Sequence, residues 1–541
     1  MTSPIRIDLA AAQSQETPET TSHAPTHSSN NHQPGDQAWP HKWGFSDTQF
    51  IVHDDRSVEL TGDRYPLCGR KLPKFIPHIE AGFGVDIDWT QPPAEVSSRT
   101  VLAPHRYEPF CQALAEQFPT RCISDDACDR LQHSHGQSTI EEVWKVLYGE
   151  LPRLVDLVFY CESPADAQTV IQLAAEHNVC LVPYGGGTSV SSALTLPTAE
   201  TRMIVSLDTQ RMRQVEWIDQ KNGRACVQAG ITGRQLDAEL KKVGFMSGHE
   251  PDSREFSTLG GWIATNASGM KKNRYGNIED IVESVTMITP TGILSEASTH
   301  PRVATGISLQ HLCFGSEGNL GLITKAIIRI RPLPEVQKYG SLLFPTMETG
   351  IDFLYALTRL GCIPASIRLV DNAQFRFSQV LKPEAVGIAK WIKRVQKFYL
   401  KNVVRFSMQE AVAATVVLEG SKQEVAYQEK TLYALAKKYK GIVGGASNGR
   451  GGYLLTYAVA YIGNFLMRFH ILGETFETTV AWSDIPSVVT AVKTELNHQH
   501  QQRQLPGRPY INYRVTQVYP TGVCLYFTMA LYMKGVDRAG E

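Results

Sequence analysis

The sequence has almost no net charge and carries no surplus of basic residues. Its 541 residues include 53 lysines and arginines against 54 acidic residues, which gives a formal net charge of −1. A chain without a positive surplus lacks a strong attraction to polyanions, so we expect no nucleic-acid partner. The 42% apolar and 20% charged residues describe a globular protein, and the length predicts two or three domains.

The cysteines lack the spacing of metal sites and of disulfide frameworks. Ten are scattered along the chain, and none forms a C-x-x-C pair. In a chain of this length they indicate reduced thiols in an intracellular compartment, and we expect no metal ion. Cys180 and Cys313 lie in apolar runs, which predicts that both belong to the core.

A secretory signal and an uninterrupted membrane span are also missing. The apolar residues near the N-terminus are interrupted by charge before they could form the apolar region of a signal peptide. The stretch 452–472 is apolar enough to resemble a span, but Arg468 and His470 lie inside it and Gly463 and Asn464 interrupt it. We therefore expect this stretch to form a buried helix or a pair of strands.

Residues 1–40 are expected to be disordered. Most of this segment, 13–37, consists of Ser, Thr, His, Asn and Pro with almost no large apolar residue. Within the segment, Arg6 and Ile7, followed after five residues by Gln13, resemble an N-terminal peroxisomal import signal. Ser14 stands where that pattern usually has an apolar residue.

What the sequence does contain is three clusters of glycine and hydroxyl residues, spread over about 140 residues. The first lies in 179–194, where an apolar run is followed by three glycines (185–187), Thr188 and Ser189. Glycines can adopt positive φ and let the backbone approach a ligand, while successive N–H groups form a nest for phosphate oxygens. This stretch predicts a nucleotide or dinucleotide cradle.

The position of this loop excludes a nicotinamide cradle. A strand over 155–160 and a helix that begins at Ser163 and Pro164 precede the strand that leads into the glycines. A fingerprint of the nicotinamide type follows the first strand and has its third glycine where Val190 stands. The pattern continues as an α+β unit, with strands over 203–207, 214–218 and 225–228 and a helix from Thr232 to Lys242.

The other two clusters follow in the same unit. One is 248–269, which has too many glycine and hydroxyl residues for an ordinary helix or strand. The other is 315–321, just before a strand over 322–330. Three such clusters predict one extended ligand that carries phosphates and a ring system.

These motifs resemble those of a known group of flavoproteins. GGGTS, EFSTLGGW, NASGMKKNRYGNIEDIV and GSEGNLGLIT look like the FAD-binding domain shared by vanillyl-alcohol oxidase and p-cresol methylhydroxylase relatives. Within that group, the longer run PDSREFSTLGGWIATNASGMKKNRYGNIEDIV is similar to the alkylglycerone-phosphate synthase (alkyldihydroxyacetonephosphate synthase) family. The same holds for RPLPEVQKYGSLLFP, PASIRLVDN, GYLLTYAVAYI, LGETFET and RVTQVYPTG.

The resemblance covers about residues 41–541 and implies an α+β protein with three parts. These are an N-terminal helical lobe at 41–150, a two-subdomain FAD-binding domain at 151–333, and a cap domain with an antiparallel sheet at 334–541. The implied cofactor is FAD. The implied flavin contacts are Pro183, Tyr184, Gly185, Gly186, Gly187, Thr188, Ser189, Asp252, Ser253, Arg254, Glu255, Phe256, Ser257, Thr258, Thr265, Asn266, Ala267, Ser268, Glu317, Gly318, Asn319, Leu320, Gly321, Leu322 and Ile323.

The reaction implied by the resemblance belongs to ether-lipid synthesis in the peroxisome. The acyl chain of acyl-dihydroxyacetone phosphate is exchanged for a long-chain fatty alcohol, and N5 of the oxidised flavin acts as an electrophile without net redox change. The protein must then supply a base, a phosphate site and an apolar tunnel. The resemblance also implies peripheral contact with the lumenal side of the peroxisomal membrane, and a homodimer is expected.

Two residues carry the implied catalysis. Tyr526 matches the tyrosine proposed to transfer a proton, and it needs a nearby cation because a phenol is a weak base at neutral pH. Arg368 matches an arginine that the family needs for activity. From the residues alone, Tyr526 would be a core tyrosine with a bonded hydroxyl, and Arg368 would form a salt bridge with Asp371.

The sequence departs from the family in two places. Gly463 stands where the family has an arginine taken to hold the substrate phosphate, so Arg450 or Arg468 would have to replace it. The chain also diverges after Gly535, before an essential histidine triplet, which predicts a truncated chain of doubtful activity. Two alternatives stay open: an FAD-dependent 2-hydroxy-acid dehydrogenase of the same fold, and a catalytically impaired flavoprotein.

Overall fold

The computed structural model describes residues 5–8, 38–39, 41–90, 98–101, 103–295, 300, 303, 306–382, 407–537 and 539. The segment predicted to be disordered, 1–40, lies mostly outside these residues, and so does Gln13 of the import motif. Its described part at the N-terminus is a strand, β1 (Ile5–Asp8), which pairs antiparallel with β4 (Ser98–Val101). The alternation of Ile5 and Ile7 with polar residues favours this extended backbone.

The predicted N-terminal lobe has two halves that pack against different parts of the molecule. The first half, 41–90, shares an aromatic core with helix α15 (Val459–Met467). In the second half, residues 110–122 pack on the first FAD subdomain, whereas Val143 and Leu147 pack against Met467 of α15 and Leu472 of the cap. The elements are β2 (Phe50–Val52), β3 (Val58–Leu60), α1 (Phe75–Phe83), α2 (Glu108–Gln117), η2 (Thr120–Cys122), β5 (Ile123–Ser124), α3 (Ala127–Gln132) and α4 (Ile140–Tyr148).

The first FAD subdomain is built on a four-stranded sheet in the order β5-β6-β8-β7. Its strands β6 (Leu157–Tyr160) and β7 (Cys180–Tyr184) both run parallel to β8 (Ile204–Asp208). The crossover helix α5 (Pro164–Glu176) begins where predicted, because the Ser163 side chain accepts a hydrogen bond from the Asp166 backbone N–H. Cys313 is buried as predicted, but Cys180 is only half-buried because β7 is the edge strand.

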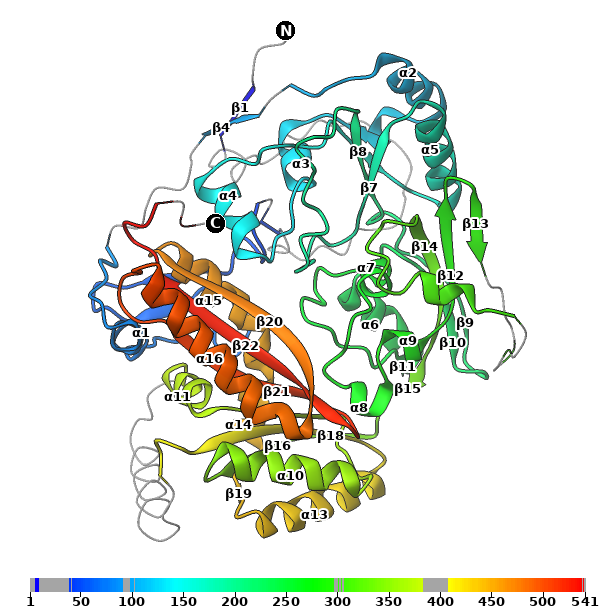
Figure 1. Ribbon diagram of the computed structural model, residues 1–541. Coiled ribbons are helices and arrows are strands. Elements are labelled where there is room, and N and C mark those ends of the chain that lie inside the picture. Colours follow the sequence, from blue (N-terminus) through cyan, green and yellow to red (C-terminus); the bar gives the residue numbers. More distant parts are fainter. Residues whose placement is uncertain are drawn as a thin grey trace.

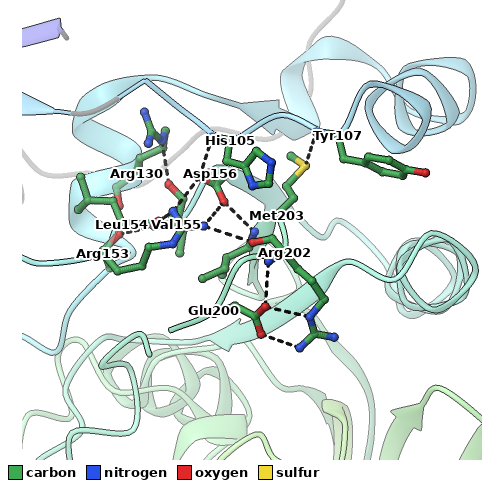
Figure 2. A network of polar contacts seen from close by, with 12 residues as sticks. His105, Tyr107, Arg130, Arg153, Leu154, Val155, Asp156, Glu200, Arg202 and Met203 are labelled. Carbon is green, nitrogen blue, oxygen red and sulfur yellow. Dashed lines mark hydrogen bonds and ion pairs between the residues drawn. The ribbon is translucent and has the colours of Figure 1, made fainter. Parts of the chain in front are cut away.

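A buried carboxylate fixes where this sheet begins (Figure 2). Asp156, 1% exposed, receives two hydrogen bonds from Arg153, at 2.9 and 2.6 Å, and one each from the backbone N–H groups of His105 and Ile204. Arg130 donates its Nε proton to the neighbouring Val155 carbonyl at 2.8 Å. One aspartate thus joins the start of β6, the start of β8 and the segment before α2.

The second FAD subdomain is a five-stranded antiparallel sheet in the order β13-β12-β14-β10-β9, with short helices against it (Figure 1). Helix α6 is capped by Thr232, as predicted. The cluster at 248–269 is less irregular than expected, because 259–264 form a short helix, α7. The elements are β9 (Val215–Asp219), β10 (Arg224–Gln228), α6 (Gly233–Lys242), β11 (Phe245–Met246), α7 (Leu259–Ala264), α8 (Lys272–Tyr275), α9 (Ile278–Ile281), β12 (Val282–Thr289), β13 (Gly292–Ser295), η3 (Leu309–Leu312), β14 (Leu322–Arg329) and β15 (Arg331–Pro332).

The cap is a seven-stranded antiparallel sheet in the order β19-β16-β18-β17-β21-β22-β20. Helices α10, α13 and α16 cover one face and bury its apolar core (Figure 1). The elements are β16 (Val336–Phe344), α10 (Met347–Arg359), β17 (Ser366–Val370), α11 (Asn372–Val380), β18 (Val412–Gly420), α13 (Lys422–Lys438), β19 (Ile442–Val443), α14 (Ala446–Leu454), η4 (Leu455–Ala458), β20 (Ile471–Ala481), η5 (Trp482–Asp484), α16 (Ile485–Gln502), β21 (Tyr510–Val518) and β22 (Gly522–Tyr532).

The apolar stretch 452–472 forms the end of α14, the turn η4, helix α15 and the start of β20. Tyr461 and Phe465 of α15 are buried among the aromatic residues of 41–90. Among the described residues, none of the helices combines the length and the apolar composition that spanning a bilayer requires.

Replacing Asp156 by asparagine is expected to lower the free energy of unfolding by about 2–4 kcal/mol, because a buried ion pair is broken and one acceptor oxygen is lost. Urea unfolding of the FAD-loaded protein measures this change. Glu200→Gln is the control, since Glu200 pairs with Arg202 at the surface and should contribute much less. Equal effects of the two substitutions would contradict the role given to Asp156.

Candidate active site

A cavity of about 1180 Å³ joins the flavin-domain clusters to the cap. All three glycine and hydroxyl clusters contribute to its wall, together with residues of α4, α11, α15 and the cap strands β20, β21 and β22. The three clusters therefore do face one large space, which is the arrangement that an extended ligand requires.

Two of the three glycines in the first cluster also have a packing role that was not predicted. Of the three, only Gly187 has a positive φ, at 65°. A Cβ atom on Gly186 would overlap the Phe256 carbonyl, and one on Gly185 would lie 2.6 Å from the Thr258 hydroxyl. The missing side chains thus allow the first loop to pack against the second cluster, which brings two ligand-facing segments together.

The same loop can hold the phosphates of FAD. In the part of the chain that the structure describes, the backbone N–H groups from Gly185 to Ser189 have no protein acceptor, and all five residues line the cavity. Successive unpaired N–H groups form an anion nest, and they need an acceptor when a ligand excludes water. The pyrophosphate of FAD fits this requirement.

Most of the predicted flavin contacts line the cavity, and four do not. Arg254 pairs with Asp237 at 2.6 Å, and Glu255 accepts a hydrogen bond from the Tyr65 hydroxyl at 2.8 Å. Phe256 packs against Trp43 and Phe45, and Leu320 is 49% exposed. The cavity-lining contacts are Pro183, Tyr184, Gly185, Gly186, Gly187, Thr188, Ser189, Asp252, Ser253, Ser257, Thr258, Thr265, Asn266, Ala267, Ser268, Glu317, Gly318, Asn319, Gly321, Leu322 and Ile323.

A polar strip crosses the cap side of the cavity. In the sheet register, Arg514 of β21 lies opposite Tyr526 of β22, and Tyr526 lies opposite Glu477 of β20. Directly opposed residues share a face, and so do residues two apart along a strand. Cavity-lining residues of these strands include the alternating sets Tyr510, Asn512, Arg514 and Thr516; Tyr526, Thr528 and Ala530; and Gly473, Thr475 and Glu477.

Tyr526 has the cationic neighbour that its expected role requires. The Arg514 guanidinium carbon lies 3.9 Å from the centre of the Tyr526 ring. Burial raises the pKa of Tyr526, while the charge of Arg514 lowers it to a smaller extent, and the net shift is upward. The phenol therefore keeps its proton at neutral pH, so the cation does not turn Tyr526 into a base as expected.

Arg368 also faces the cavity, and its alternative partner is excluded. Its Nη1 donates to the Thr456 hydroxyl at 3.0 Å, and within the described residues it forms no ion pair with Asp371. Asp371 instead accepts hydrogen bonds from the backbone N–H groups of Gln374 and Tyr513. The salt-bridge interpretation was wrong because Asp371 caps α11.

The two arginines expected to replace the one missing at Gly463 do not line the main cavity. Gly463 lines the cavity, whereas neither Arg450 nor Arg468 is among its lining residues. Arg468 lines a smaller cavity of about 260 Å³ instead. The arginine that sequence reasoning missed is Arg514, which the alternation of polar and apolar residues in 510–516 could have indicated.

A buried ion cluster holds the cap against the flavin domain. Lys271 Nζ lies 2.9 Å from Glu250 and 3.1 Å from Glu419 of β18, and Lys271 and Glu419 are almost fully buried. Burial lowers the pKa of Lys271, but the charges and hydrogen bonds of the two carboxylates together outweigh burial, so the net shift of this pKa is upward. Burial likewise opposes ionisation of Glu250, yet the pKa of Glu250 is lowered because Lys271 is close. Lys272 adds a second link by donating to the Val518 carbonyl at 2.6 Å.

Replacing Lys271 by methionine is expected to lower the free energy of unfolding by about 3–5 kcal/mol near pH 7, because buried carboxylates lose their counter-ion. In the wild-type chain, the lowered pKa of Glu250 contributes stability above its ordinary pKa of about 4.3, which is lost as the pH falls further. In the variant this carboxyl group would bind a proton more readily, so the difference between the two proteins should shrink at pH 5.

Urea unfolding at both pH values measures this dependence. Lys338→Met, which removes an exposed ion pair with Glu429, is the matched control and should change stability little at either pH. A Lys271→Met loss that does not shrink on acidification would contradict the assignment of Lys271 as counter-ion to Glu250.

Two family models and a solved flavoenzyme structure match this chain. The family model described as "FAD binding domain" matches residues 155–298, and the one described as "FAD linked oxidases, C-terminal domain" matches residues 333–541. A solved 4-ethylphenol oxidase from Gulosibacter chungangensis aligns over 81% of this chain and 86% of its own, with a TM-score of 0.57 and 12% identity. These matches confirm the predicted fold class and FAD as the cofactor.

More similar proteins share one name. The alkyldihydroxyacetonephosphate synthase of Caenorhabditis elegans is 39% identical over 500 residues, which cover 92% of this chain and 83% of that protein. The Dictyostelium discoideum enzyme of that name is 31% identical over 439 residues, 81% of this chain and 71% of its own. A solved alkyldihydroxyacetonephosphate synthase structure aligns over 93% of this chain and 92% of its own, with a TM-score of 0.82 and 28% identity.

Proposed function

This chain belongs to the alkyldihydroxyacetonephosphate synthase family, and we propose that it exchanges the acyl chain of 1-acyl-dihydroxyacetone phosphate for a long-chain fatty alcohol. The products are 1-alkyl-dihydroxyacetone phosphate, a precursor of ether lipids, and a fatty acid. The observation that carries the proposal is a cavity whose wall combines the flavin-domain clusters, a polar strip with Arg368 and Tyr526, and an apolar side.

The apolar side supports a substrate with long hydrocarbon chains. It is formed by residues in and next to helices α11 and α15, namely Phe377, Leu381, Ile462, Leu466 and Met467. Apolar chains gain free energy from such a wall, whereas a charged headgroup would be placed at the polar strip. The cavity therefore has a polar region and an apolar region, which match the charged headgroup and the hydrocarbon chain of a phospholipid precursor.

The proposed exchange breaks the bond between the dihydroxyacetone carbon and the acyl oxygen and joins the same carbon to the alcohol oxygen. When bound, FAD supplies an electrophilic ring for this carbon without net oxidation. The proton lost by the alcohol must pass to the departing carboxylate. Tyr526 is the group we assign to this transfer, because its phenolic oxygen carries a proton at neutral pH and can donate one before it accepts another.

Arg368 is the second residue to which we assign a catalytic role. Its guanidinium is buried and lines the cavity, and in the described part of the chain its hydrogen-bond partner is the neutral Thr456 hydroxyl. It therefore retains hydrogen-bonding capacity for substrate. A positive charge here would stabilise the negative charge on the headgroup or on the departing carboxylate.

Location and assembly remain part of the proposal. We place the enzyme in the peroxisome, peripherally on the lumenal side of the membrane, because the lipid substrates expected for this family are found there. We also expect a homodimer. The motif from Arg6 to Gln13 is the sequence feature that would direct import.

Replacing Tyr526 by phenylalanine should lower the rate of ether formation by about 10²–10⁴-fold with little change in FAD content, since only the proton-transferring oxygen is removed. The assay is incorporation of labelled hexadecanol into alkyl-dihydroxyacetone phosphate by the purified FAD-loaded chain. Tyr510→Phe is the matched control, because Tyr510 lines the same cavity and accepts a hydrogen bond from Asn512.

The same preparation distinguishes the alternatives. Bleaching of the flavin by lactate or glycolate would indicate a 2-hydroxy-acid dehydrogenase. A retained yellow cofactor with no ether product would indicate a flavoprotein without this activity. Equal rates for Tyr526→Phe and the wild-type chain would reject the role of Tyr526 alone.

Import is tested separately from catalysis. A fluorescent reporter fused to residues 1–40 is expected to reach peroxisomes, and Arg6→Ala should abolish its delivery because the motif loses its charged residue. Confocal imaging with a peroxisomal marker gives the result. Lys42 lies outside the fused segment, so Lys42→Ala in a reporter fused to residues 1–45 provides a charge-matched control. Unchanged delivery of the Arg6→Ala reporter would reject this signal.

A further inference from the structure

We propose that Arg514, together with Arg368, forms the binding site for a phosphate monoester on the cap side of the cavity. Naming that ester as the dihydroxyacetone phosphate headgroup rests on the proposed function. The presence of an anion site does not, because it follows from two buried guanidinium groups.

The two arginines lie on neighbouring strands and share a face of the sheet. In the pairing of β17 with β21, Val370 is directly opposite Arg514. Arg368 precedes Val370 by two residues, so its side chain points to the same side as that of Arg514. Both residues line the cavity, and the charge of Arg368 opposes that of Arg514.

Arg514 has no hydrogen-bond acceptor of its own among the described residues. Only 8% of its surface is exposed, its Nε proton has no partner there, and its guanidinium carbon lies over the Tyr526 ring. Arg368 is 7% exposed, and within the same described residues its Nε has no partner and its Nη1 donates to Thr456. The charges of Asp252 and Glu477 act on Arg514, but within the described structure neither carboxylate lies within ion-pair distance, 4.0 Å, of its guanidinium.

Two buried guanidinium groups that have no ion-pair partner among the described residues are unfavourable unless an anion joins them. Removing a guanidinium from water costs several kcal/mol, and a second positive charge nearby adds to that cost. A dianionic phosphate would neutralise both charges and accept hydrogen bonds from both guanidinium groups. A neutral or singly charged ligand would do this less well. The unpaired N–H groups of the glycine loop at 185–189 supply a separate place for the FAD phosphates.

The test is isothermal titration calorimetry of the FAD-loaded protein with dihydroxyacetone phosphate and, as a neutral counterpart, dihydroxyacetone. The wild-type chain is expected to bind the phosphate ester, and Arg514→Met should weaken this binding at least tenfold. Arg514→Lys keeps the positive charge but loses the planar guanidinium, so its affinity for dihydroxyacetone phosphate should lie between those of the wild-type chain and Arg514→Met. Arg468→Met is the matched control, because Arg468 lines the separate smaller cavity.

Folding of the variant is checked by thermal unfolding with and without dihydroxyacetone phosphate. Arg514→Met should be at least as stable as the wild-type chain without ligand, since it removes an unpaired buried charge. The ligand should raise the unfolding temperature of the wild-type chain and not that of the variant. In a double-mutant cycle, Arg514→Met and Arg368→Met should not be additive, because they contact one ligand.

The outcomes separate this inference from the proposed function. Equal affinity of the wild-type chain and Arg514→Met for dihydroxyacetone phosphate would overturn the inference. So would loss of FAD in the variant with unchanged phosphate affinity, because Arg514 would then serve the cofactor. Binding that depends on Arg514 in a chain that forms no ether product would support the anion site and reject the proposed function alone.

Discussion

The arrangement of the active site depends on the buried lysine that joins two domains. Lys271 comes from the flavin domain and is shared by Glu250 of that domain and Glu419 of the cap. Because a buried charge is tolerated only with its partners in place, this cluster allows little variation in how the domains meet. The cavity lies across the same junction, so the ion cluster helps to fix the distance between the flavin clusters and the polar strip of the cap, together with contacts such as that of Lys272 with the Val518 carbonyl.

The polar and apolar walls of the cavity come from strands and from a helix, whose side chains share a face at different intervals along the sequence. Three cap strands present alternate residues to it, which places Arg514, Tyr526 and Glu477 in one row. Helix α15 presents an apolar side instead. Every second residue of a strand points to the same face, whereas a helix forms an apolar stripe when apolar residues recur every three or four positions. The site therefore contains a charged region and a hydrocarbon region without a separate domain for each.

Local signals in the sequence were sufficient to predict much of the flavin domain. Ser163 and Thr232 begin helices as capping residues, and the glycine clusters line one cavity. One error is local, because Asp371 caps α11 and does not pair with Arg368. The others concern contacts between distant segments. The close approach of Gly186 to Phe256 depends on how two loops pack. The position of Arg514 beside Tyr526 and near Arg368 depends on the register of β21 with its neighbouring strands. No local pattern contains that information, although alternation along 510–516 shows which residues share a face.

The aromatic core shared by 41–90 and helix α15 has a consequence for biosynthesis. Phe50, Phe75 and Trp89 are made early, whereas the residues that bury them, such as Phe465, are made after the whole flavin domain has emerged from the ribosome. Contacts between such distant segments form slowly because a long loop must close. The nascent chain therefore keeps these aromatic side chains exposed throughout most of its synthesis, a state in which aggregation competes with folding.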